Sequence, residues 1–596
     1  MNLPFDDSRR LTGANLYFDE AGAVLETVGD LPGEPLLAAW RQRIVAMRQA
    51  LAWPDAALVV HRHARGASLA FAAPLDQLYS ATEVNEWAWL AARRTIDAMD
   101  ASLHAPGHPA AWDEDSARHT LRAFAAAERR PDLLALVIAA EARGLTALID
   151  DATLSLGEGS GAMSWSMSAL PALDAVPWAA LHDIPVALVT GSNGKTTTVR
   201  LLAAMARAHG WPTGYSCTDG VFVDGVPLDA GDFSGPAGAR AVLRQPRIEA
   251  AVLETARGGI LRRGIAVHHA NVAVVTNVSD DHFGEYGIHD LAGLAEVKLT
   301  VARTLGHDGT LVLNADDAML VQQAVTRAVA ASSAGTPLTP LAWFAFDIAH
   351  PLLLAQRERG GSACGVRDNH LWLFHHGGEH DLGAIATMPL SFAGSARYNI
   401  ANMAAAALAA AALGIAPPTI ATVLARFGAA HADNPGRLQH WRFGALDVFV
   451  DYAHNPEGLR GLLQVATGNR RDGRLGLVLG QAGNREDAEI RELAAVAAGF
   501  QPQRVVLKDI EGFMRGRISG EVASILRDEL LQRSVLSETI VECLDEVDAV
   551  RGLLAWARDG DVLVLPTHGT QARQTVIGLL DGLQLAGWKA GVPLQD

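Results

Sequence analysis

Residues 189–200 read VTGSNGKTTTVR, a glycine-rich stretch that contains a lysine followed by three threonines. An apolar run at 184–190 leads into it and a helical pattern follows, so the stretch is expected to connect a buried strand to a helix. Backbone N–H groups at a helix N-terminus bind phosphate oxygens, and Lys195 would add positive charge beside them. The common phosphate-binding loop has four residues between its glycines, whereas two residues separate Gly191 from Gly194. The sequence therefore predicts a nucleotide site with a shortened loop, the alternative being a glycine turn with an exposed lysine.

Polar side chains also follow two later apolar runs that we expect to be strands. Glu254 ends the first run, within VLETARGGILRRG, and the second run leads into TNVSDDH, which contains His282. Oxygen ligands suit Mg²⁺, so Thr196 and Glu254 are candidates to bind it together, and His282 is a candidate ligand of a second metal. The carboxyl ends of the strands in an open α/β sheet form the edge where ligands bind. Taken alone, a glutamate or histidine in such a position is more often a solvated charge or a turn residue.

The composition is that of a large globular protein. The chain has 596 residues, of which 49% are hydrophobic and 19% charged, and this length indicates roughly three or four domains. The formal net charge of −17 argues against a nucleic-acid or anionic-membrane partner. The N-terminal MNLPFDDSRR lacks the apolar core of a signal peptide, and three scattered cysteines fit a reducing compartment, so we expect a cytoplasmic protein. The apolar run 402–418 is too short to span a bilayer and predicts a buried helix.

The patterns divide the chain into three parts and predict a multidomain α/β fold. Residues 1–170 mix strand-like and helical patterns and predict an α+β domain for acceptor binding or oligomerisation, ending in a Gly/Ser/Pro-rich linker at about 151–180. Residues 171–432 alternate short apolar runs with helices, which predicts a central parallel-sheet domain with a β insertion near 350–392. Residues 433–596 predict a smaller, Rossmann-like C-terminal domain. The active site is expected in the cleft between the last two parts.

Seven motifs follow one another along the chain: GSNGKTTT, ETARGGILRRG, TNVSDDH, LNADD, YNIANMAAAA, NPGRLQ and VDYAHNPEG. This succession, over about residues 182–570, resembles the Mur ligase superfamily, whose members are ATP-dependent amide-bond ligases of peptidoglycan and folylpolyglutamate synthesis. GDFSGP, ETARGGILRRG and DNPGRLQ most resemble the Mur-like C-terminal half of cyanophycin synthetases. The shortened phosphate loop agrees with this resemblance, because Mur ligases use G-[TS]-N-G-K-T-[TS].

The resemblance implies a set of ATP-binding residues: Gly191, Ser192, Asn193, Gly194, Lys195, Thr196, Thr197, Asn314, Asn399, Arg437, Asp451 and His454. By this likeness Lys195 contacts the outer phosphates of ATP. Asn314 and Asn399 correspond to positions around the adenine. Arg437 and Asp451 correspond to positions near the ribose and phosphates, with His454 beside them.

The resemblance also implies Mg²⁺ as a cofactor, with Thr196 and Glu254 at the first ion and His282 at the second. Lys298 lies where many members of the family carry a carbamylated lysine that assists the second metal. The alternative for Lys298 is an exposed helix lysine. The candidate catalytic residues are thus Lys195, Glu254, His282, Lys298 and Arg437.

Two segments of the last part correspond to family regions near the incoming amino acid. QAGNREDAEIREL resembles a family motif, but Asn484 stands where aspartate is usual. LKDIEGFMRGR supplies Arg515 and Arg517, whose guanidinium groups are candidates to bind the α-carboxylate of the amino acid. The alternative for both arginines is a charged surface loop.

The resemblance implies an ATP-dependent ligase that joins an amino acid, with arginine or lysine favoured, to a carboxylate of a peptide or polymer such as an aspartate chain. Cyanophycin synthetases also contain an ATP-grasp module, for which the residues before the phosphate loop leave no room. A separate ATP-grasp or cyanophycin synthetase enzyme is therefore a candidate partner. We also expect the chain to form homo-oligomers. Two alternatives stay open: a nucleotide-binding, non-catalytic scaffold of such an enzyme, and another Mur-type peptide ligase. A phosphate-loop NTPase that drives movement is disfavoured, because that class does not need DYAHNP or YNIAN.

Overall fold

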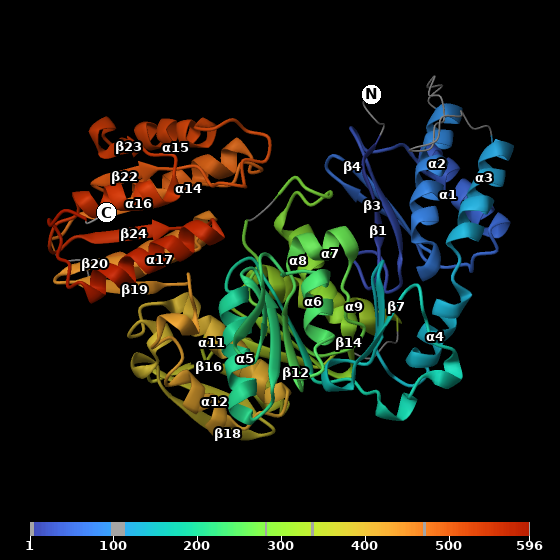
Figure 1. Cartoon of the computed structure of the whole chain (residues 1–596), viewed down its shortest axis with the longest axis horizontal. Helices are drawn as coiled ribbons and strands as arrows, with labels where there is room; N and C mark the ends of the chain where they lie inside the picture. Colours follow the sequence, from blue (N-terminus) through green and yellow to red (C-terminus); the bar gives the residue numbers. More distant parts are fainter. Residues whose placement is uncertain (1–4, 97–113, 281–282, 335–338, 469–471, 595–596) are drawn as a thin grey trace.

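The computed structural model describes residues 5–96, 114–280, 283–334, 339–468 and 472–594. An N-terminal, a central and a C-terminal region follow one another along the chain, coloured from blue to red (Figure 1). Each region contains its own large β-sheet. The expected multidomain α/β class, with an α+β N-terminal region, is confirmed.

Antiparallel strands and three helices form the start of the N-terminal region. The four-stranded sheet has the order β1-β2-β4-β3, with β1 (Phe5–Leu11), β2 (Gly22–Thr27), β3 (Leu58–His63) and β4 (Gly66–Ala72). Helices α1 (Glu34–Ala50), α2 (Leu78–Ile96) and α3 (Glu114–Glu128) pack with it. Trp40, Trp89 and Phe71 are buried in the shared core. These apolar side chains form a core that is separate from the two cores of the central region.

The Gly/Ser/Pro-rich stretch at about 151–180 is not a linker, so that prediction is wrong. Helix α4 (Pro131–Glu141) leads into a three-stranded antiparallel sheet of β5 (Ala147–Ile149), β6 (Thr153–Leu156) and β7 (Met163–Ser166). Leu154 and Leu156 are buried in this sheet. Close packing requires Gly161, since a Cβ there would lie 2.2 Å from the backbone oxygen of His182. The small residues of the stretch therefore permit close packing rather than flexibility.

An eleven-stranded sheet forms the centre of the molecule, in the order β11-β10-β9-β12-β8-β13-β14-β15-β16-β17-β18. Its strands are β8 (Val186–Thr190), β9 (Thr213–Cys217), β10 (Gly220–Val223), β11 (Val226–Ala230), β12 (Ala250–Glu254), β13 (Ala270–Val275), β14 (Leu305–Asn314), β15 (Leu341–Asp347), β16 (Ala363–Arg367), β17 (His370–His375) and β18 (Gly378–Ala384). From β9 to β16 all neighbours pair in parallel, and antiparallel strands extend the sheet at both ends. The expected β insertion near 350–392 is therefore one end of this sheet.

Helices cover both faces of the central sheet. Successive side chains of a strand point to opposite faces, so each strand contributes to two cores. Val186 and Leu188 of β8 face a core shared with α6 (Pro236–Leu243), α7 (Arg257–Arg263), α8 (Leu291–Leu299), α9 (Ala318–Ala334) and α10 (Pro351–Glu358). Ala187 and Val189 face the opposite core, with α5 (Lys195–His209), α11 (Arg397–Ala412) and α12 (Pro417–Leu424). The alanine-rich run 402–418 begins within α11, a buried helix as predicted, which ends at Ala412.

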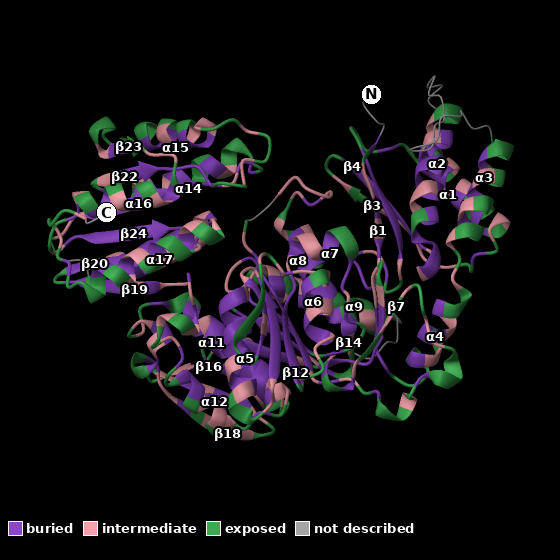
Figure 2. Ribbon diagram, in the orientation of Figure 1, coloured by how far each residue is buried: buried purple, intermediate pink, exposed green. Residues whose placement is uncertain are grey.

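The C-terminal region is a smaller sheet with helices on both faces. Its order is β19-β20-β24-β21-β22-β23, with β19 (Gln439–Phe443), β20 (Leu446–Asp451), β21 (Leu475–Leu479), β22 (Arg504–Leu507), β23 (Ile540–Glu542) and β24 (Val562–Pro566). Helices α13 (Pro456–Gly468), α14 (Asp487–Gly499), α15 (Glu521–Gln532), α16 (Glu546–Trp556) and α17 (Thr570–Leu585) flank it. All strand pairs except β19–β20 are parallel, and the inner strands of the central and C-terminal sheets are buried (Figure 2). Among the described residues, no helix has the length and apolar character needed to cross a bilayer.

Candidate active site

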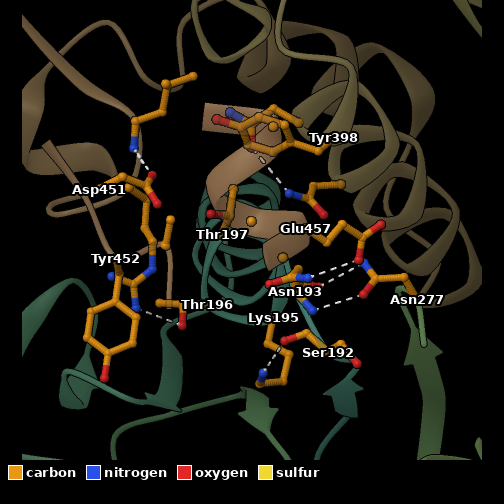
Figure 3. Close-up of a pocket in the computed structure, with 18 of the residues that line it drawn as sticks. Ser192, Asn193, Lys195, Thr196, Thr197, Asn277, Tyr398, Asp451, Tyr452 and Glu457 are labelled. Carbon is orange, nitrogen blue, oxygen red and sulfur yellow. Dashed lines mark hydrogen bonds between the residues drawn. The ribbon is translucent and has the colours of Figure 1, made fainter. Parts of the chain in front are cut away.

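A cavity of about 470 Å³ lies between the central and C-terminal regions. Residues 192–197 and the start of α11 line it from the central side, and residues from 451–464 line it from the C-terminal side (Figure 3). Residues 192–197 directly follow β8, and residue 451 ends β20. The cavity therefore lies at the carboxyl ends of parallel strands, the edge where open α/β sheets bind ligands.

Two glycines allow the shortened phosphate loop to pack closely against its neighbours. Gly191 has a φ of +147°, and a Cβ there would lie 1.9 Å from the Thr276 hydroxyl oxygen. Gly194 has a φ of +84°, and a Cβ there would lie 2.1 Å from Oδ1 of Asn402. Helix α5 begins at Lys195, directly after this turn. The loop thus leads into a helix N-terminus, the arrangement that binds phosphate through backbone N–H groups.

Side chains that follow β13 hold the phosphate loop in place. Thr276 Oγ1 donates a hydrogen bond to the Asn193 carbonyl oxygen at 2.6 Å, and Asn277 Nδ2 donates to the same oxygen at 3.1 Å. The Asn193 N–H donates to Asn277 Oδ1 at 2.9 Å. Within the loop, Lys195 Nζ donates to the Ser192 carbonyl oxygen at 3.0 Å. Asn277 is one of the polar residues that follow this strand in the sequence, but it is not among the predicted site residues.

A carboxylate and a hydroxyl lie side by side in the cavity. Thr196 Oγ1 donates to Glu254 Oε2 at 2.8 Å, and Thr218 Oγ1 donates to Glu254 Oε1 at 3.0 Å. Glu254 is the last residue of β12 and is 2% exposed. Hard oxygen ligands of this kind suit Mg²⁺, so the residues present fit the expected ion. The structure brings Lys195, Thr196 and Glu254 to one cavity.

Three arginines from distant segments surround Asp219, which follows β9. Arg200 Nη2 contacts Asp219 Oδ2 at 2.7 Å, Arg437 Nη2 lies 3.7 Å from the same oxygen, and Arg573 forms a close ion pair with Oδ1. Burial opposes the ionisation of Asp219, but the three guanidinium groups outweigh it and lower the pKa of that carboxyl. Arg437 Nη2 also donates to Thr196 Oγ1 at 3.4 Å. The cluster therefore holds one guanidinium group beside the phosphate loop.

Most of this cluster was not predicted from the sequence. Arg437 belongs to a recognised motif, whereas Asp219, Arg200 and Arg573 do not. Arg200 is a lone arginine within the apolar stretch TTTVRLLAAMA of α5, and it is 4% exposed. A single charge on the buried face of a helix indicates a buried ion pair, and this signal could have identified Arg200 but not its partner.

The loop after β20 forms the C-terminal wall of the cavity. Asp451 Oδ2 accepts a hydrogen bond from the Leu438 N–H at 2.5 Å. Burial raises the pKa of the Asp451 carboxyl, although the charge of Arg437 opposes the shift. The Arg437 guanidinium lies 4.5 Å from the centre of the Tyr452 ring, and His454 lines the cavity beside them. Arg437, Asp451 and His454 are thus neighbours in one wall.

The two asparagines predicted near the adenine occupy different positions. Asn399 lines the cavity, and its Nδ2 donates to the Leu390 carbonyl oxygen at 3.0 Å. Asn314 is not among the residues that line the cavity. Its Nδ2 donates to the Thr276 carbonyl oxygen at 3.0 Å, and its Oδ1 accepts from the Asp316 N–H at 3.0 Å. In this structure Asn314 therefore stabilises the strand ends behind the phosphate loop, while Asn399 lies at the cavity itself.

The residues predicted at a second metal are described only in part. Lys298 on α8 is 2% exposed, so it is not an exposed helix lysine. His282 lies outside the described residues. The second metal site and the carbamylation of Lys298 therefore stay predictions.

The two arginines predicted to bind an amino acid lie on the loop after β22 and are not among the residues that line the cavity. Arg517 Nε donates to the Gly483 carbonyl oxygen at 2.9 Å, and its two Nη atoms contact Glu521 and Asp487, each at 2.7 Å. These contacts tie two loops together and use Nε and both Nη atoms, and the binding of a carboxylate by Arg517 stays a prediction. Arg515 is exposed, with a φ of +49°, and its role stays a prediction.

Two further contacts, both made by Asn193, connect the central and C-terminal regions beside the cavity. Asn193 Oδ1 accepts a hydrogen bond from Asn455 Nδ2 at 2.9 Å. Asn193 Nδ2 donates to Glu457 Oε2 at 3.2 Å (Figure 3). Elsewhere along the boundary, Asn484 Nδ2 donates to Glu285 Oε1 at 3.2 Å. An aspartate in place of Asn484 would face the Glu285 carboxylate, which gives a physical reason for the departure from the family motif.

The fold and the cavity define a class of protein in which a phosphate loop at the end of a parallel strand faces a second α/β domain. Residues 189–349 match the Mur ligase middle domain, and residues 436–567 match the Mur ligase glutamate ligase domain. Both walls of the cavity therefore contain residues from segments that match Mur ligase domains.

Curated relatives agree with these domain matches. Cyanophycin synthetase from Synechocystis sp. is 34% identical over 390 residues, which cover 64% of this chain and 43% of that protein. UDP-N-acetylmuramoyl-L-alanyl-D-glutamate–2,6-diaminopimelate ligase from Xanthomonas campestris pv. campestris is 29% identical over 400 residues, covering 66% of this chain and 73% of that protein.

The solved structure of E. coli FolC in complex with ADP, without folate substrate, has 18% sequence identity and a TM-score of 0.48, covering 67% of this chain and 90% of that chain. This chain matches less than half the length of the cyanophycin synthetase.

Proposed function

We propose that the chain is an ATP-dependent ligase that forms an amide bond between a carboxylate substrate and an amine. The observation that carries this proposal is a single cavity between two Mur-type domains, lined by Lys195, Thr196, Glu254 and Arg437. A phosphate loop alone would support a simple nucleotide hydrolase equally well. The C-terminal wall that faces the loop supports a ligase, because a second domain can close over a reactive intermediate.

In the first step, a carboxylate oxygen of the acceptor attacks the γ-phosphorus of ATP. The bond from that phosphorus to the bridging oxygen breaks, so that ADP leaves and an acyl phosphate forms. Negative charge spreads over the phosphoryl oxygens during this transfer. Lys195 and Arg437 would neutralise it, together with the backbone N–H groups at the start of α5.

Thr196 and Glu254 are the residues that would hold Mg²⁺. When bound, the ion would supply positive charge that stabilises the phosphoryl oxygens of ATP. The hydrogen bond from Thr218 keeps the Glu254 carboxylate oriented toward Thr196. His282 and Lys298 remain the candidates for a second ion.

In the second step, the amine nitrogen attacks the carbonyl carbon of the acyl phosphate. The carbon–oxygen bond to phosphate breaks, inorganic phosphate leaves, and the amine releases a proton. Acyl phosphates hydrolyse in water, so the cavity must stay closed while the intermediate exists. The contacts of Asn193 with Asn455 and Glu457 support a closure in which the C-terminal domain covers the phosphate loop.

Arginine or lysine is the proposed amine, and an aspartate-rich peptide or polymer is the proposed acceptor. The similarity to cyanophycin synthetases supports this choice, although it covers 43% of the Synechocystis protein. A separate ATP-grasp enzyme would then form the backbone that this chain modifies. The similarity to the diaminopimelate ligase supports a peptide carboxylate as the acceptor in either case.

The test follows phosphate release and product mass in the same reactions. The purified chain is incubated with ATP, Mg²⁺, short aspartate-containing peptides and each standard amino acid in turn. We expect phosphate release only when an acceptor and an amine are both present, with a product whose mass is their sum minus one water. Release that never depends on an amine would contradict the ligase. A chain that binds ATP without turnover, yet raises the activity of a separate cyanophycin synthetase, would support the scaffold instead.

A further inference from the structure

A fully buried lysine lies behind the C-terminal wall of the cavity and takes no part in the proposed chemistry. Lys508 follows β22 and is 0% exposed, and its Nζ forms a close ion pair with Glu546 at the start of α16. The same Nζ lies 3.2 Å from Nδ1 of His568, the second residue after β24. Glu546 and His568 are each 4% exposed. Charges buried this deeply are costly unless each partner is satisfied.

The Glu546 carboxylate is satisfied by several donors at once. Besides Lys508, its Oε1 accepts a hydrogen bond from the His568 backbone N–H at 3.0 Å, and its Oε2 accepts from the Gly569 N–H at 2.8 Å. Gly569 leaves room for this carboxylate, since a Cβ there would lie 2.6 Å from Oε2. Glu546 therefore fixes both the Lys508 ammonium group and the turn that carries His568.

The contacts of His568 determine which ring nitrogen carries its proton. An ammonium group offers donors and no acceptor, so Lys508 Nζ donates and His568 Nδ1 accepts. The ring proton is then on Nε2, which donates to the Ala453 carbonyl oxygen at 3.0 Å. Burial and the charge of Lys508 lower the pKa of His568 well below its usual value. A second ring proton would point at the ammonium group, so the imidazole stays neutral.

Ala453 belongs to the loop that forms the C-terminal wall. Its neighbours Tyr452 and His454 line the cavity with it. The His568 ring also meets the Tyr452 ring edge-on, with 5.4 Å between the ring centres. His568 itself is not among the lining residues. Its hydrogen bond therefore anchors the wall from behind, where no contact with a bound nucleotide is needed.

We propose that Lys508 is a positioning residue for nucleotide binding, which acts through the tautomer of His568 on the loop 452–454. This inference rests on the proposed function, since it assumes that the cavity binds ATP. Without Lys508, an acceptor remains beside Nδ1, because Glu546 Oε1 lies 3.8 Å from it, and this acceptor draws the ring proton of His568 to Nδ1. The unprotonated Nε2 then faces the Ala453 carbonyl oxygen, two acceptors repel, and the wall loses its anchor.

The test removes the ion pair without leaving a buried charge, by combining Lys508→Met with Glu546→Gln. In wild-type protein labelled with ¹⁵N-histidine, we expect the Nε2–H tautomer of His568 at neutral pH, assigned by the loss of its signal in His568→Gln. The double variant should gain the Nδ1–H tautomer. Its Kd for a non-hydrolysable ATP analogue with Mg²⁺, measured by calorimetry, should rise by about tenfold, the factor expected for one lost hydrogen bond.

A matched control removes another ion pair from the same sheet, in which Asp561 is buried and Arg474 is 28% exposed. Arg474 and Asp561 pair at 2.5 Å and lie at the amino ends of the strands, away from the cavity. Arg474→Met combined with Asp561→Asn should lower stability while the Kd for the ATP analogue and the His568 signal stay unchanged. A Kd that rises equally in this control would show that general destabilisation, and not the wall, accounts for the effect, and would overturn the proposal.

Other outcomes separate this inference from the proposed function. A wild-type His568 with its proton on Nδ1, an unchanged tautomer in the double variant, or an unchanged Kd after the tautomer has moved would each overturn the role of Lys508. Failure of the wild-type chain to bind the ATP analogue would instead refute the proposed function. The tautomer is measured without nucleotide, so the two failures are distinguishable.

Discussion

The two walls of the cavity are held together in different ways. On the central side, Lys195 begins α5 after the short loop 191–194 that follows β8, and Glu254 ends the neighbouring parallel strand β12. On the C-terminal side, the loop 451–454 is held by residues from remote segments, among them Arg573 and His568. A wall of the first kind depends on local motifs. A wall of the second kind depends on long-range packing, so its loss should affect stability as well as binding.

The lysines of the chain illustrate the same contrast. There are four of them, at positions 195, 298, 508 and 589. Lys195 is half-buried in the central wall, Lys508 is buried behind the C-terminal wall, and Lys298 is buried on α8. Lys589 is exposed. Arginine supplies nearly all other positive charge, so each buried lysine can be tested against Lys589 as a matched control.

Replacing Lys195 by alanine should give the largest effect on activity. We expect the rate of ATP-dependent amide formation to fall by about 10²- to 10³-fold, because a positive charge is lost where the phosphoryl charge develops. The fold should persist, since Lys195 Nζ bonds to the Ser192 carbonyl oxygen within its own loop. Phosphate release and circular dichroism measure the two quantities. Lys589→Ala should leave the rate and the circular dichroism spectrum unchanged. A near wild-type rate for Lys195→Ala would mean that the phosphate loop does not take part in the reaction.

Replacing Asp219 by asparagine tests the long-range support of the second wall. Three guanidinium groups would lose their shared carboxylate, so the free energy of unfolding should fall by about 3 kcal/mol. The affinity for ATP should fall as well, because Arg437 would no longer be held beside Thr196. Urea unfolding and calorimetry are the measurements. Asp308→Asn is the control, since that side chain is 89% exposed; equal effects of the two changes would mean that the cluster holds nothing together.

The pH dependence of stability should distinguish Asp219 from an ordinary surface aspartate. Its pKa is lowered in the folded state, so its ionisation stabilises the fold above the pKa of an unfolded aspartate, about 3.9. This contribution disappears as the pH falls through the lower, folded value. The stability difference between wild type and Asp219→Asn should therefore shrink on acidification below about pH 4, in urea titrations at successive pH values. A difference that stays constant would mean that the carboxylate charge is not what holds the cluster.

The central wall could largely be predicted from the sequence, for a physical reason. A buried parallel strand leaves its next residues at the ligand-binding edge, so GSNGKTTT after 184–190 and Glu254 at the end of its run both point to one place. The same reasoning identifies the alternating strands and helices of the central and C-terminal regions. It depends on contacts between residues that are close in sequence or lie on adjacent strands.

The features that the sequence analysis missed depend on contacts between residues that are far apart in the sequence. Asp219 meets Arg573 only because the two domains pack together, and no local pattern predicts that pair. Arg517 looks like a free basic residue in LKDIEGFMRGR, but two loops fold around it and use its donors. The stretch 151–180 looks like a linker because small residues serve flexible segments and close packing equally well. The structure shows which of the two applies here, because Gly161 packs closely against His182.

The smallest expected effect concerns the hydrogen bond between Asn484 and Glu285, which connects the C-terminal region to the central region. Asn484→Asp removes the donor to Glu285 and sets two carboxylates against each other at a solvent-exposed boundary. Exposed charge pairs change the free energy little, so we expect the KM for the amine to rise by roughly two- to fivefold. More phosphate should be released in the absence of amine, because the closed state forms less often. Asn484→Ala separates the two causes, since it loses the hydrogen bond without adding charge.

Glu285→Gln should rescue the Asn484→Asp variant, because a glutamine amide can donate to the new carboxylate and reverses the original contact. The rescue must appear in the coupling between amine binding and phosphate release. The single Glu285→Gln change also removes the ion pair of Glu285 with the buried Arg257, so it is measured alongside the double variant as the control for that loss. If the double variant is no better than Asn484→Asp alone, the Asn484–Glu285 contact does not govern closure. The hydrogen bonds of Asn193 to Asn455 and Glu457 would then be the contacts through which the C-terminal domain closes.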